Sequence, residues 1–244
     1  MPNSTAPESL RIEAQPGALS FTLNTPAPGN EISGVMMDSM IEALATHGVD
    51  PLMRVLRLRA EGPAFCTGRE RAGKTPVSIR AEVGRLIALK KALRASPLIT
   101  VAEVQGDAHG FGMGLAMLCD FTLVSSSARL AFPEMRKGLP PAAIMAYMNS
   151  YGLPKACFPL VLFGDDFSPA QALAAGLITQ ICEPAELRAE ADRIADRILG
   201  LDPDSARQCK AFFQAAQEAT VEQNFRLAHE ALTVTTLRLM GDKR

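Results

Sequence analysis

Residues 101–141 read VAEVQGDAHGFGMGLAMLCDFTLVSSSARLAFPEMRKGLPP, and the fold prediction starts from this stretch. An apolar run at 98–104 has the composition of a buried strand. It leads into a cluster of four glycines, Gly106, Gly110, Gly112 and Gly114. A short apolar helical segment, 113–118, follows, and a second strand-like run lies at 121–124. A strand, a glycine turn and a helix start predict an anion site, because their backbone N–H groups lack partners and the helix dipole adds positive potential.

The glycine spacing does not identify the anion. Gly110, Gly112 and Gly114 give G-x-G-x-G, which differs from the dinucleotide fingerprint G-x-G-x-x-G, and no GK[ST] follows for a phosphate loop. A tight connection between a strand and a helix, without any ligand, is the alternative explanation of the glycines.

Composition limits the class of protein. The 244 residues are 48% hydrophobic and 21% charged, with a net charge of −1, which fits a packed soluble domain and gives no sign of a polyanion-binding surface. No apolar run reaches the ~20 residues of a membrane helix, and residues 1–9 lack the features of a signal peptide, so they are expected to be a disordered lead-in.

The cysteines and histidines indicate a reduced protein without a metal site. The five cysteines form no C-x-x-C pair and lie mostly in apolar surroundings, which predicts buried thiols and a cytoplasmic protein. The three histidines have no metal-ligand spacing, and no metal or separate cofactor is expected.

The rest of the chain alternates strands and helices, which predicts an α/β fold with one sense of winding. Strands are expected on both sides of Gly17, at 54–59 and at 177–182, and residues 64–70 form a second turn of small residues. Helices are expected at 33–48, 78–95, 142–151, 155–163, 169–175, 186–199, 203–219 and 221–240.

The final helix has more apolar residues than a solvent-facing helix needs. They lie along one face, at Phe225, Ala228, Leu232, Thr235 and Leu239. Packing onto another subunit and folding back onto the same chain explain this pattern equally well.

Several segments together resemble the enoyl-CoA hydratase/isomerase (crotonase) superfamily. Residues 30–33, NEIS, resemble the helix entry N-A-L-[ST], and 64–70, AFCTGRE, resemble A-F-C-A-G-A-D. Residues 105–120 resemble N-G-x-A-x-G-G-G-x-E-L-A-x-x-C-D, with Gln105 in place of Asn. Residues 132–138 resemble a shortened F-x-x-P-E-x-x-x-G, and 168–177 resemble A-x-E-A-x-x-x-G-L.

The resemblance implies a crotonase-like spiral of ββα units that binds an acyl-CoA thioester, with coenzyme A as part of the substrate. It implies an acyl-CoA-binding core at 10–185 and a helical C-terminal region at 186–244 that builds homotrimers or hexamers. Nucleic acid and membrane partners are not expected. The backbone N–H groups of Arg69 and Phe111 are implied as an oxyanion hole for the thioester oxygen, and Phe111, where relatives carry glycine, is expected to narrow the space above it.

Further positions follow from the same motifs. Contacts with the substrate are implied at Thr67, Gly68, Glu70, His109, Gly110, Gly112, Gly114 and Leu139. Arg69, Arg71 and Lys74 form a basic cluster that is either a solvated loop or a contact for the CoA phosphates. Lys210 and Arg226 are candidates to reach the nucleotide of a neighbouring subunit.

The carboxylates distinguish the possible reactions. Hydratases of the family hold water between two glutamates, but here the first position is Gly114 and only the second, Glu134, is acidic. Apolar neighbours are expected to raise the pKa of Glu134, which suits a base that moves a proton between C2 and C4 and favours isomerase slightly over hydratase. Asp107, His109 and Arg136 are the candidates to orient water in place of the missing glutamate. A hydrolase or lyase acting on an unusual acyl-CoA, and a non-catalytic acyl-CoA-binding protein, remain alternatives.

Overall fold

The fold is built on a six-stranded sheet. The computed structural model describes residues 9–27 and 29–241. Strands β1 (Leu10–Gln15) and β2 (Ala18–Leu23) form an antiparallel hairpin. The next four strands run parallel to β2 and to one another, in the order β3 (Val55–Ala60), β5 (Ile99–Val104), β7 (Phe121–Ser125) and β10 (Gln180–Cys182).

A second, smaller sheet consists of very short strands. Its order is β4 (Ala64–Cys66), β6 (Asp107–His109), β8 (Leu130–Ala131) and β9 (Asp166–Phe167). The first three strands are parallel and β9 is antiparallel to β8. Each of three successive turns of the chain therefore gives one strand to each sheet, β3 and β4, β5 and β6, then β7 and β8, which is the expected spiral.

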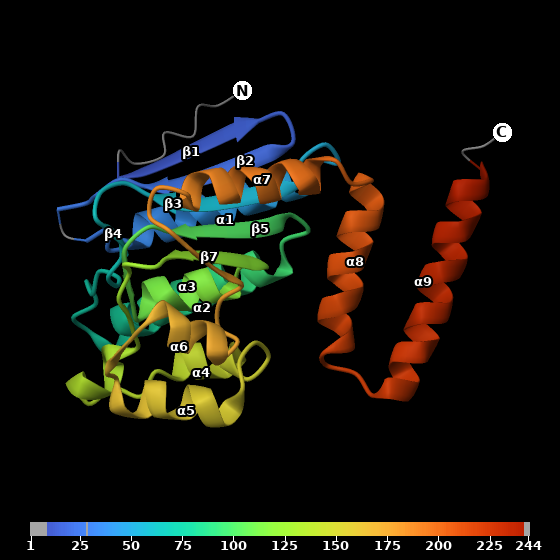
Figure 1. The fold of residues 1–244 in the computed structure, drawn as a ribbon. Helices are drawn as coiled ribbons and strands as arrows, with labels where there is room; N and C mark the ends of the chain where they lie inside the picture. The colour runs from blue at the N-terminus through green and yellow to red at the C-terminus, as the bar shows by residue number, and fades with distance from the viewer. Residues whose placement is uncertain (1–8, 28, 242–244) are drawn as a thin grey trace.

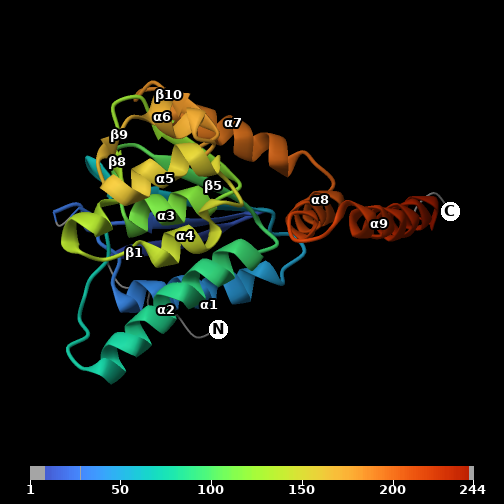
Figure 2. The ribbon, with the colours of Figure 1, turned by 90° about the horizontal axis from the view of Figure 1, so that it is seen from below.

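Helices cover both faces of the large sheet. On one side lie α1 (Gly34–Gly48), α2 (Pro76–Ala95) and α3 (Phe111–Leu118), and on the other lies α7 (Leu187–Leu199), as Figure 2 shows. Helices α1 and α2 begin at Ser33 and Thr75, whose side-chain oxygens accept from backbone N–H groups of the first turn. The sequence-based prediction located both helices, with a start for α2 two residues too late.

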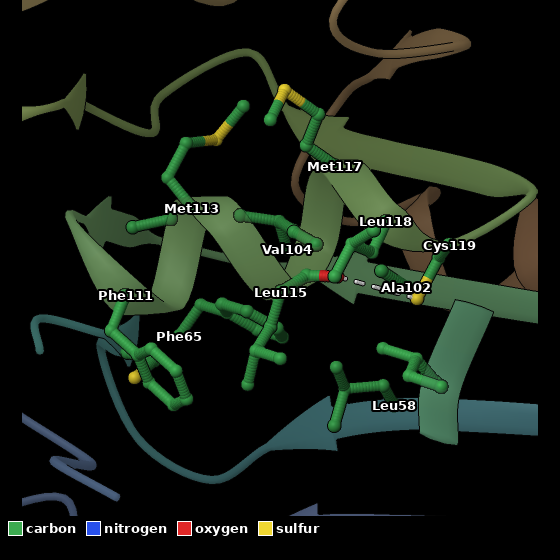
Figure 3. Close-up of a cluster of buried hydrophobic side chains, with 14 of the residues drawn as sticks. Leu58, Phe65, Ala102, Val104, Phe111, Met113, Leu115, Met117, Leu118 and Cys119 are labelled. Atoms are coloured by element: carbon green, nitrogen blue, oxygen red, sulfur yellow. Dashed lines mark hydrogen bonds between the residues drawn. The ribbon is translucent and has the colours of Figure 1, made fainter. Parts of the chain in front are cut away.

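Helix α3 passes through the middle of the core. All eight of its residues are buried, which agrees with its lack of polar side chains. Figure 3 shows Phe111 and Leu115 on one side of the helix near Phe65, and Met113 and Met117 on the opposite side. Gly112 is required here, because a Cβ atom would lie 2.2 Å from the carbonyl oxygen of Cys66. The backbone of α3 is thereby held directly against β4.

A layer of short helices follows the second sheet. It contains the 3₁₀ helix η1 (Pro133–Lys137), α4 (Ala142–Met148), α5 (Pro154–Phe163) and α6 (Pro169–Ala174). Helix α4 ends three residues earlier than expected, at Met148, and a turn follows it. This layer closes one side of the pocket described below.

The C-terminal helices differ in their contacts. Helix α7 packs its apolar face on β3, β5 and β7, whereas α8 (Pro203–Ala216) and α9 (Val221–Gly241) project from the body of the molecule as a pair (Figures 1 and 2). Helix α7 therefore packs as part of the core, although the sequence-based prediction assigned it to the C-terminal oligomerisation region at 186–244. No helix in the described ranges combines the length and apolar character needed to cross a membrane.

Helix α9 is partly covered by α8. The half-buried positions of α9 include Ala228 and Thr235, and the Thr235 hydroxyl donates to Gln208 Oε1 on α8 at 2.6 Å. Phe225 and Leu232, however, are 68% and 69% exposed. The predicted apolar face is therefore divided between a contact with α8 and an open surface. The side chain of Leu239 and the lead-in residues 1–8 lie outside the described part of the chain.

The cysteines are unpaired, as expected from the sequence. All five lie within the described ranges and none forms a disulfide. Four are buried, and burial raises the pKa of the Cys66 and Cys119 thiols to about 12. Cys209 on α8 is the exception to the expected burial.

Candidate active site

A pocket of about 580 Å³ opens where the turn after β4, the start of α3 and η1 meet. Helices α2 and α4 supply the opposite wall through residues that include Leu86, Lys90 and Ile144. The pocket therefore lies between segments that are far apart in the sequence, and the spiral brings the two motif turns, 64–70 and 105–114, to the same place.

The first turn directs one backbone amide away from its neighbouring strand. Ile32 donates to the carbonyl of Gly68 at 3.2 Å and accepts from the N–H of Glu70 at 3.1 Å. In such a parallel bridge the intervening residue, Arg69, has its own N–H on the other side. No acceptor for this N–H is found among the described residues, and Arg69 lines the pocket. The amide is free to bind a ligand oxygen.

The second turn presents another amide at a helix start. Gly110 precedes α3 with a φ of 51°, a conformation that glycine adopts at little cost. Phe111 is the first helical residue, so its N–H has no partner within the helix, and the described residues outside the helix provide none. The positive end of the helix dipole lies at the same point. Phe111 is only 6% exposed, and its ring lies on the Leu115 side of α3 (Figure 3).

Glu134 lies against the second turn. A Cβ atom on Gly110 would be 2.8 Å from Glu134 Oε1, so the carboxylate is in contact with the residue that precedes the Phe111 amide. Glu134 Oε2 is buried and has no hydrogen-bond partner in the described part of the chain. Burial raises the pKa of Glu134, and the positive charges of Lys90, Arg71 and Lys137 oppose that rise. The direction agrees with the sequence-based expectation, although Met135 and Leu139 are themselves exposed.

The space beside Gly114 is filled by the side chains of Tyr147, Lys90 and Ile144. A Cβ atom on Gly114 would lie 2.8 Å from Tyr147 Oη and 3.2 Å from Lys90 Nζ. Lys90 donates to Tyr147 Oη at 2.9 Å and to the carbonyl of Ala143 at 3.2 Å, and Tyr147 donates to the carbonyl of Gly114 at 2.7 Å. Burial lowers the pKa of Lys90 to about 7, against a smaller, opposite effect of Glu134. The pocket therefore holds a carboxylate and a titratable amine.

The structure brings together most of the residues singled out in the sequence. The pocket is lined by Thr67, Gly68, Arg69, Gly110, Phe111, Glu134 and Leu139. Four others do not line it: Glu70, His109, Gly112 and Gly114. Gly112 and Gly114 instead allow close packing behind the pocket wall, as described above.

Of the basic residues singled out in the sequence, some line the pocket and others do not. Arg71 lines the pocket, but Lys74 does not, and the Arg69 side chain pairs with Glu82 on α2. Lys210 is bonded within its own chain, to Asp120 Oδ2 and the carbonyl of Leu98, each at 2.7 Å. Lys210 is thus held by its own chain, and its expected reach to a neighbouring subunit stays a prediction.

The residues expected to replace the missing glutamate are elsewhere. Asp107 pairs with Arg129 and Arg136 pairs with Asp165, and neither lines the pocket. The sequence-based prediction missed Lys90 and Tyr147, which lie 24 residues before and 33 residues after Gly114 in the chain. No motif contains either residue, although a lysine within the apolar run of an amphipathic helix was a usable signal.

Two backbone amides without partners and one carboxylate at the same pocket are typical of an enzyme that stabilises a developing negative charge and moves a proton. Comparison with known proteins identifies the family. The chain belongs to the enoyl-CoA hydratase/isomerase family, whose model matches residues 13–238.

Individual relatives agree with this assignment. A putative enoyl-CoA hydratase of Thermus thermophilus is 31% identical, over 96% of this chain and 93% of its own. A crystal structure of a putative enoyl-CoA hydratase from Streptomyces coelicolor matches with a TM-score of 0.89 at 23% identity, over 96% of this chain and 88% of that one. A putative enoyl-CoA hydratase from Thermobifida fusca, solved in complex with CoA, matches with a TM-score of 0.86 at 23% identity, over 96% and 95%. These matches confirm the crotonase fold.

Proposed function

We propose that this protein is an acyl-CoA enzyme that stabilises a thioester enolate with the amides of Arg69 and Phe111 while Glu134 moves a proton. The observation that carries the proposal is the contact between the Glu134 carboxylate and Gly110, immediately before a backbone N–H that has no partner. An acid beside an anion-stabilising amide is the arrangement that proton removal next to a carbonyl requires. The CoA complex of the Thermobifida fusca relative supports a CoA thioester as the substrate.

Double-bond isomerisation is the simplest reaction for one carboxylate. Glu134 would remove a proton from C2 of a 3-enoyl thioester and return it to C4, with the negative charge held at the thioester oxygen between the two steps. The two amides act only when that charge forms, and the loss of one such donor typically costs about 3–4 kcal/mol of transition-state stabilisation. Because position 114 carries no carboxylate, isomerisation is the reaction that needs Glu134 alone, whereas hydration needs a second group that supplies a proton.

The decisive experiment measures turnover of 3-enoyl-CoA after replacement of each of two pocket carboxylates. We expect the wild-type protein to convert 3-enoyl-CoA, measured by absorbance of the conjugated product, and Glu134→Gln to lose about 10²–10⁴-fold in rate. Glu31 is the other carboxylate that lines the pocket, so Glu31→Gln tests whether any pocket carboxylate has the same effect. Turnover that survives Glu134→Gln would remove the assignment of the base.

The same assay separates the alternative reactions. Conversion of 2-enoyl-CoA to a 3-hydroxyacyl product supports hydration, and release of free thiol supports a hydrolase. Tight CoA binding without turnover of either substrate supports a non-catalytic acyl-CoA-binding protein.

The exposed face of the C-terminal helices supports assembly of several copies, as a homotrimer or hexamer. Phe213 on α8 is 67% exposed, and Phe225 and Leu232 on α9 are exposed to a similar extent. A chain that leaves such side chains open is expected to cover them with a partner surface.

A further inference from the structure

Lys90 and Tyr147 occupy the place that a side chain at position 114 would take. Their terminal atoms lie 3.2 Å and 2.8 Å from an ideal Cβ on Gly114. Lys90 comes from α2, Tyr147 from α4 and Gly114 from α3, so three separate elements meet at this point. The space beside Gly114 is therefore occupied by packed and hydrogen-bonded side chains and is not an empty cavity.

One N–H group of the Lys90 ammonium has no acceptor among the described residues. An ammonium carries three N–H groups. Two of them bond the carbonyl of Ala143 and the Tyr147 hydroxyl, and no third acceptor is found among the described residues. Because Lys90 lines the pocket while only 5% of its surface is exposed, the remaining N–H is available to a ligand and shielded from bulk water.

Filling space does not by itself explain a lysine here, although its bonds to Ala143 and Tyr147 also link α2 to α4. Burial of an ammonium is costly, and an apolar side chain of the same length would fill the site without that cost. The surroundings are apolar as well, with the Phe111 ring centroid 5.4 Å and the Tyr147 ring centroid 4.8 Å from Nζ. Both rings stabilise a cation at this position.

Burial and the charge of Glu134 act in opposite directions on the protonation of Lys90. Glu134 on η1 is the carboxylate whose charge acts on Lys90, and Tyr147 on α4 is kept neutral because burial raises its pKa. Arg71 and Lys137 act on Glu134 from the rim of the pocket. With burial lowering the pKa of Lys90 to about 7, the amine is able to give and take a proton near neutral pH.

We propose that Lys90 is a second catalytic residue, which protonates the leaving hydroxyl at C3 of a 3-hydroxyacyl thioester while Glu134 removes the proton at C2. This inference rests on the proposed function, because it uses the same amides and the same glutamate. It replaces the pair of glutamates used by hydratases of this family with a glutamate and a lysine.

The step is balanced in atoms and charge. The C2–H bond breaks, its proton goes to the Glu134 carboxylate, and its electrons form the C2=C3 bond through the enolate. The C3–O bond breaks, the oxygen keeps both electrons, and the Lys90 ammonium supplies the proton that completes a water molecule. Neutral Lys90 and protonated Glu134 remain, and transfer of the proton from the acid to the amine through water restores the pair. Hydration is the same path in reverse.

Isomerisation needs no proton at C3, so the two reactions depend differently on Lys90. In Lys90→Met we expect dehydration of a 3-hydroxyacyl-CoA, and the reverse hydration, to fall at least about 100-fold, whereas 3-enoyl isomerisation falls less than about 5-fold. Lys91 is exposed on the same helix, and Lys91→Met is the matched control for loss of one lysine. A purely structural lysine would lower both reactions together.

The pH profile and the stability of the variant give independent readouts. In the wild-type protein kcat/KM for dehydration should fall as the pH rises through about 7, because the ammonium is lost, and Lys90→Met should lack this limb. Thermal unfolding shows whether Lys90→Met is folded at the assay temperature, so that a selective loss of dehydration is distinguished from loss of the fold. Should Lys90→Met fail to fold, Tyr147→Phe removes the hydroxyl that positions Lys90 and should lower dehydration more than isomerisation.

Three results would overturn the inference. One is a wild-type protein that isomerises but neither hydrates nor dehydrates, and another is Lys90→Met with an unchanged ratio of the two rates. The third is a wild-type protein with no turnover at all, which would also overturn the proposed function. In the first two cases Glu134→Gln still abolishes isomerisation, so failure of the inference is distinguished from failure of the proposed function.

Discussion

Helices α7 and α9 both carry apolar residues at helical spacing, but their surroundings are opposite. Helix α7 buries Leu187, Ala191 and Ile198 against the large sheet, within a cluster that includes strand residues of β3, β5 and β7. Helix α9 leaves Phe225 and Leu232 more than two thirds exposed. An amphipathic pattern therefore predicts that a face is to be covered, but it does not say whether the same chain or another one covers it.

Helix α8 joins these two environments mainly through polar contacts. Arg207 donates to the carbonyl of Met53 at 2.7 Å, Lys210 to that of Leu98 at 2.7 Å, and Gln214 to that of Arg94 at 3.0 Å. These carbonyls lie next to the ends of the core elements, where backbone groups lack partners within a strand or helix. The projecting pair is thus attached by hydrogen bonds, whereas α7 is attached by apolar burial.

The largest effect is expected on α7. Leu187→Ala should lower the free energy of unfolding by about 2–4 kcal/mol, because it removes buried methyl groups from a packed cluster and leaves a cavity. Denaturant unfolding measures the change. Leu52 is 71% exposed, and Leu52→Ala should change the free energy by less than about 0.5 kcal/mol. Equal losses in the two variants would mean that α7 is not held by its apolar face.

The sequence predicted the long elements of the core because their patterns are long enough to repeat. The strands near 54–59 and 98–104 and the helices that begin at Ser33 and in the segment after Lys74 all carry several periods of their pattern. Strands β4, β6 and β8 were missed. They have two or three residues, which is too short for alternation, and they form only because the spiral places them side by side.

The candidate site was predicted only where it lies on a motif. Gly110, Phe111 and Glu134 are close in the sequence, and the pocket contains all three. Lys90 and Tyr147 lie in no motif, and their meeting at Gly114 could not be predicted because it depends on how α2, α3 and α4 pack. Glycine at position 114, where the family motif has glutamate, was visible in the sequence, but the side chains that pack around it were not.

A smaller effect is expected at the attachment of α8. Lys210→Met removes the bonds to the Leu98 carbonyl and Asp120 Oδ2, while Asp120 keeps two bonds from Thr100. We expect a loss of about 1–3 kcal/mol, because a buried carbonyl is left unpaired and a carboxylate loses its counter-charge. Denaturant unfolding measures the loss, and hydrogen exchange should show faster opening of α8 than of α7.

The control for this variant is the exposed Lys155 on α5, whose replacement by Met removes the same charge without a buried contact. If hydrogen exchange in α7 and α8 accelerated equally, the two helices would be one cooperative unit, and the distinction drawn between them would fail.

The smallest effect on the stability of the single chain is expected on α9. Leu232→Gln should change the low-concentration unfolding free energy by less than about 0.5 kcal/mol, because the side chain is 69% exposed. In the wild-type protein the unfolding midpoint should rise with protein concentration, since assembly binds only the folded chain. In the variant that dependence should weaken, and sedimentation should show a smaller mass. A wild-type protein that sediments as one chain at every concentration would mean that no other copy covers Phe225 and Leu232, and α9 would then have to be stabilised by its contact with α8 alone.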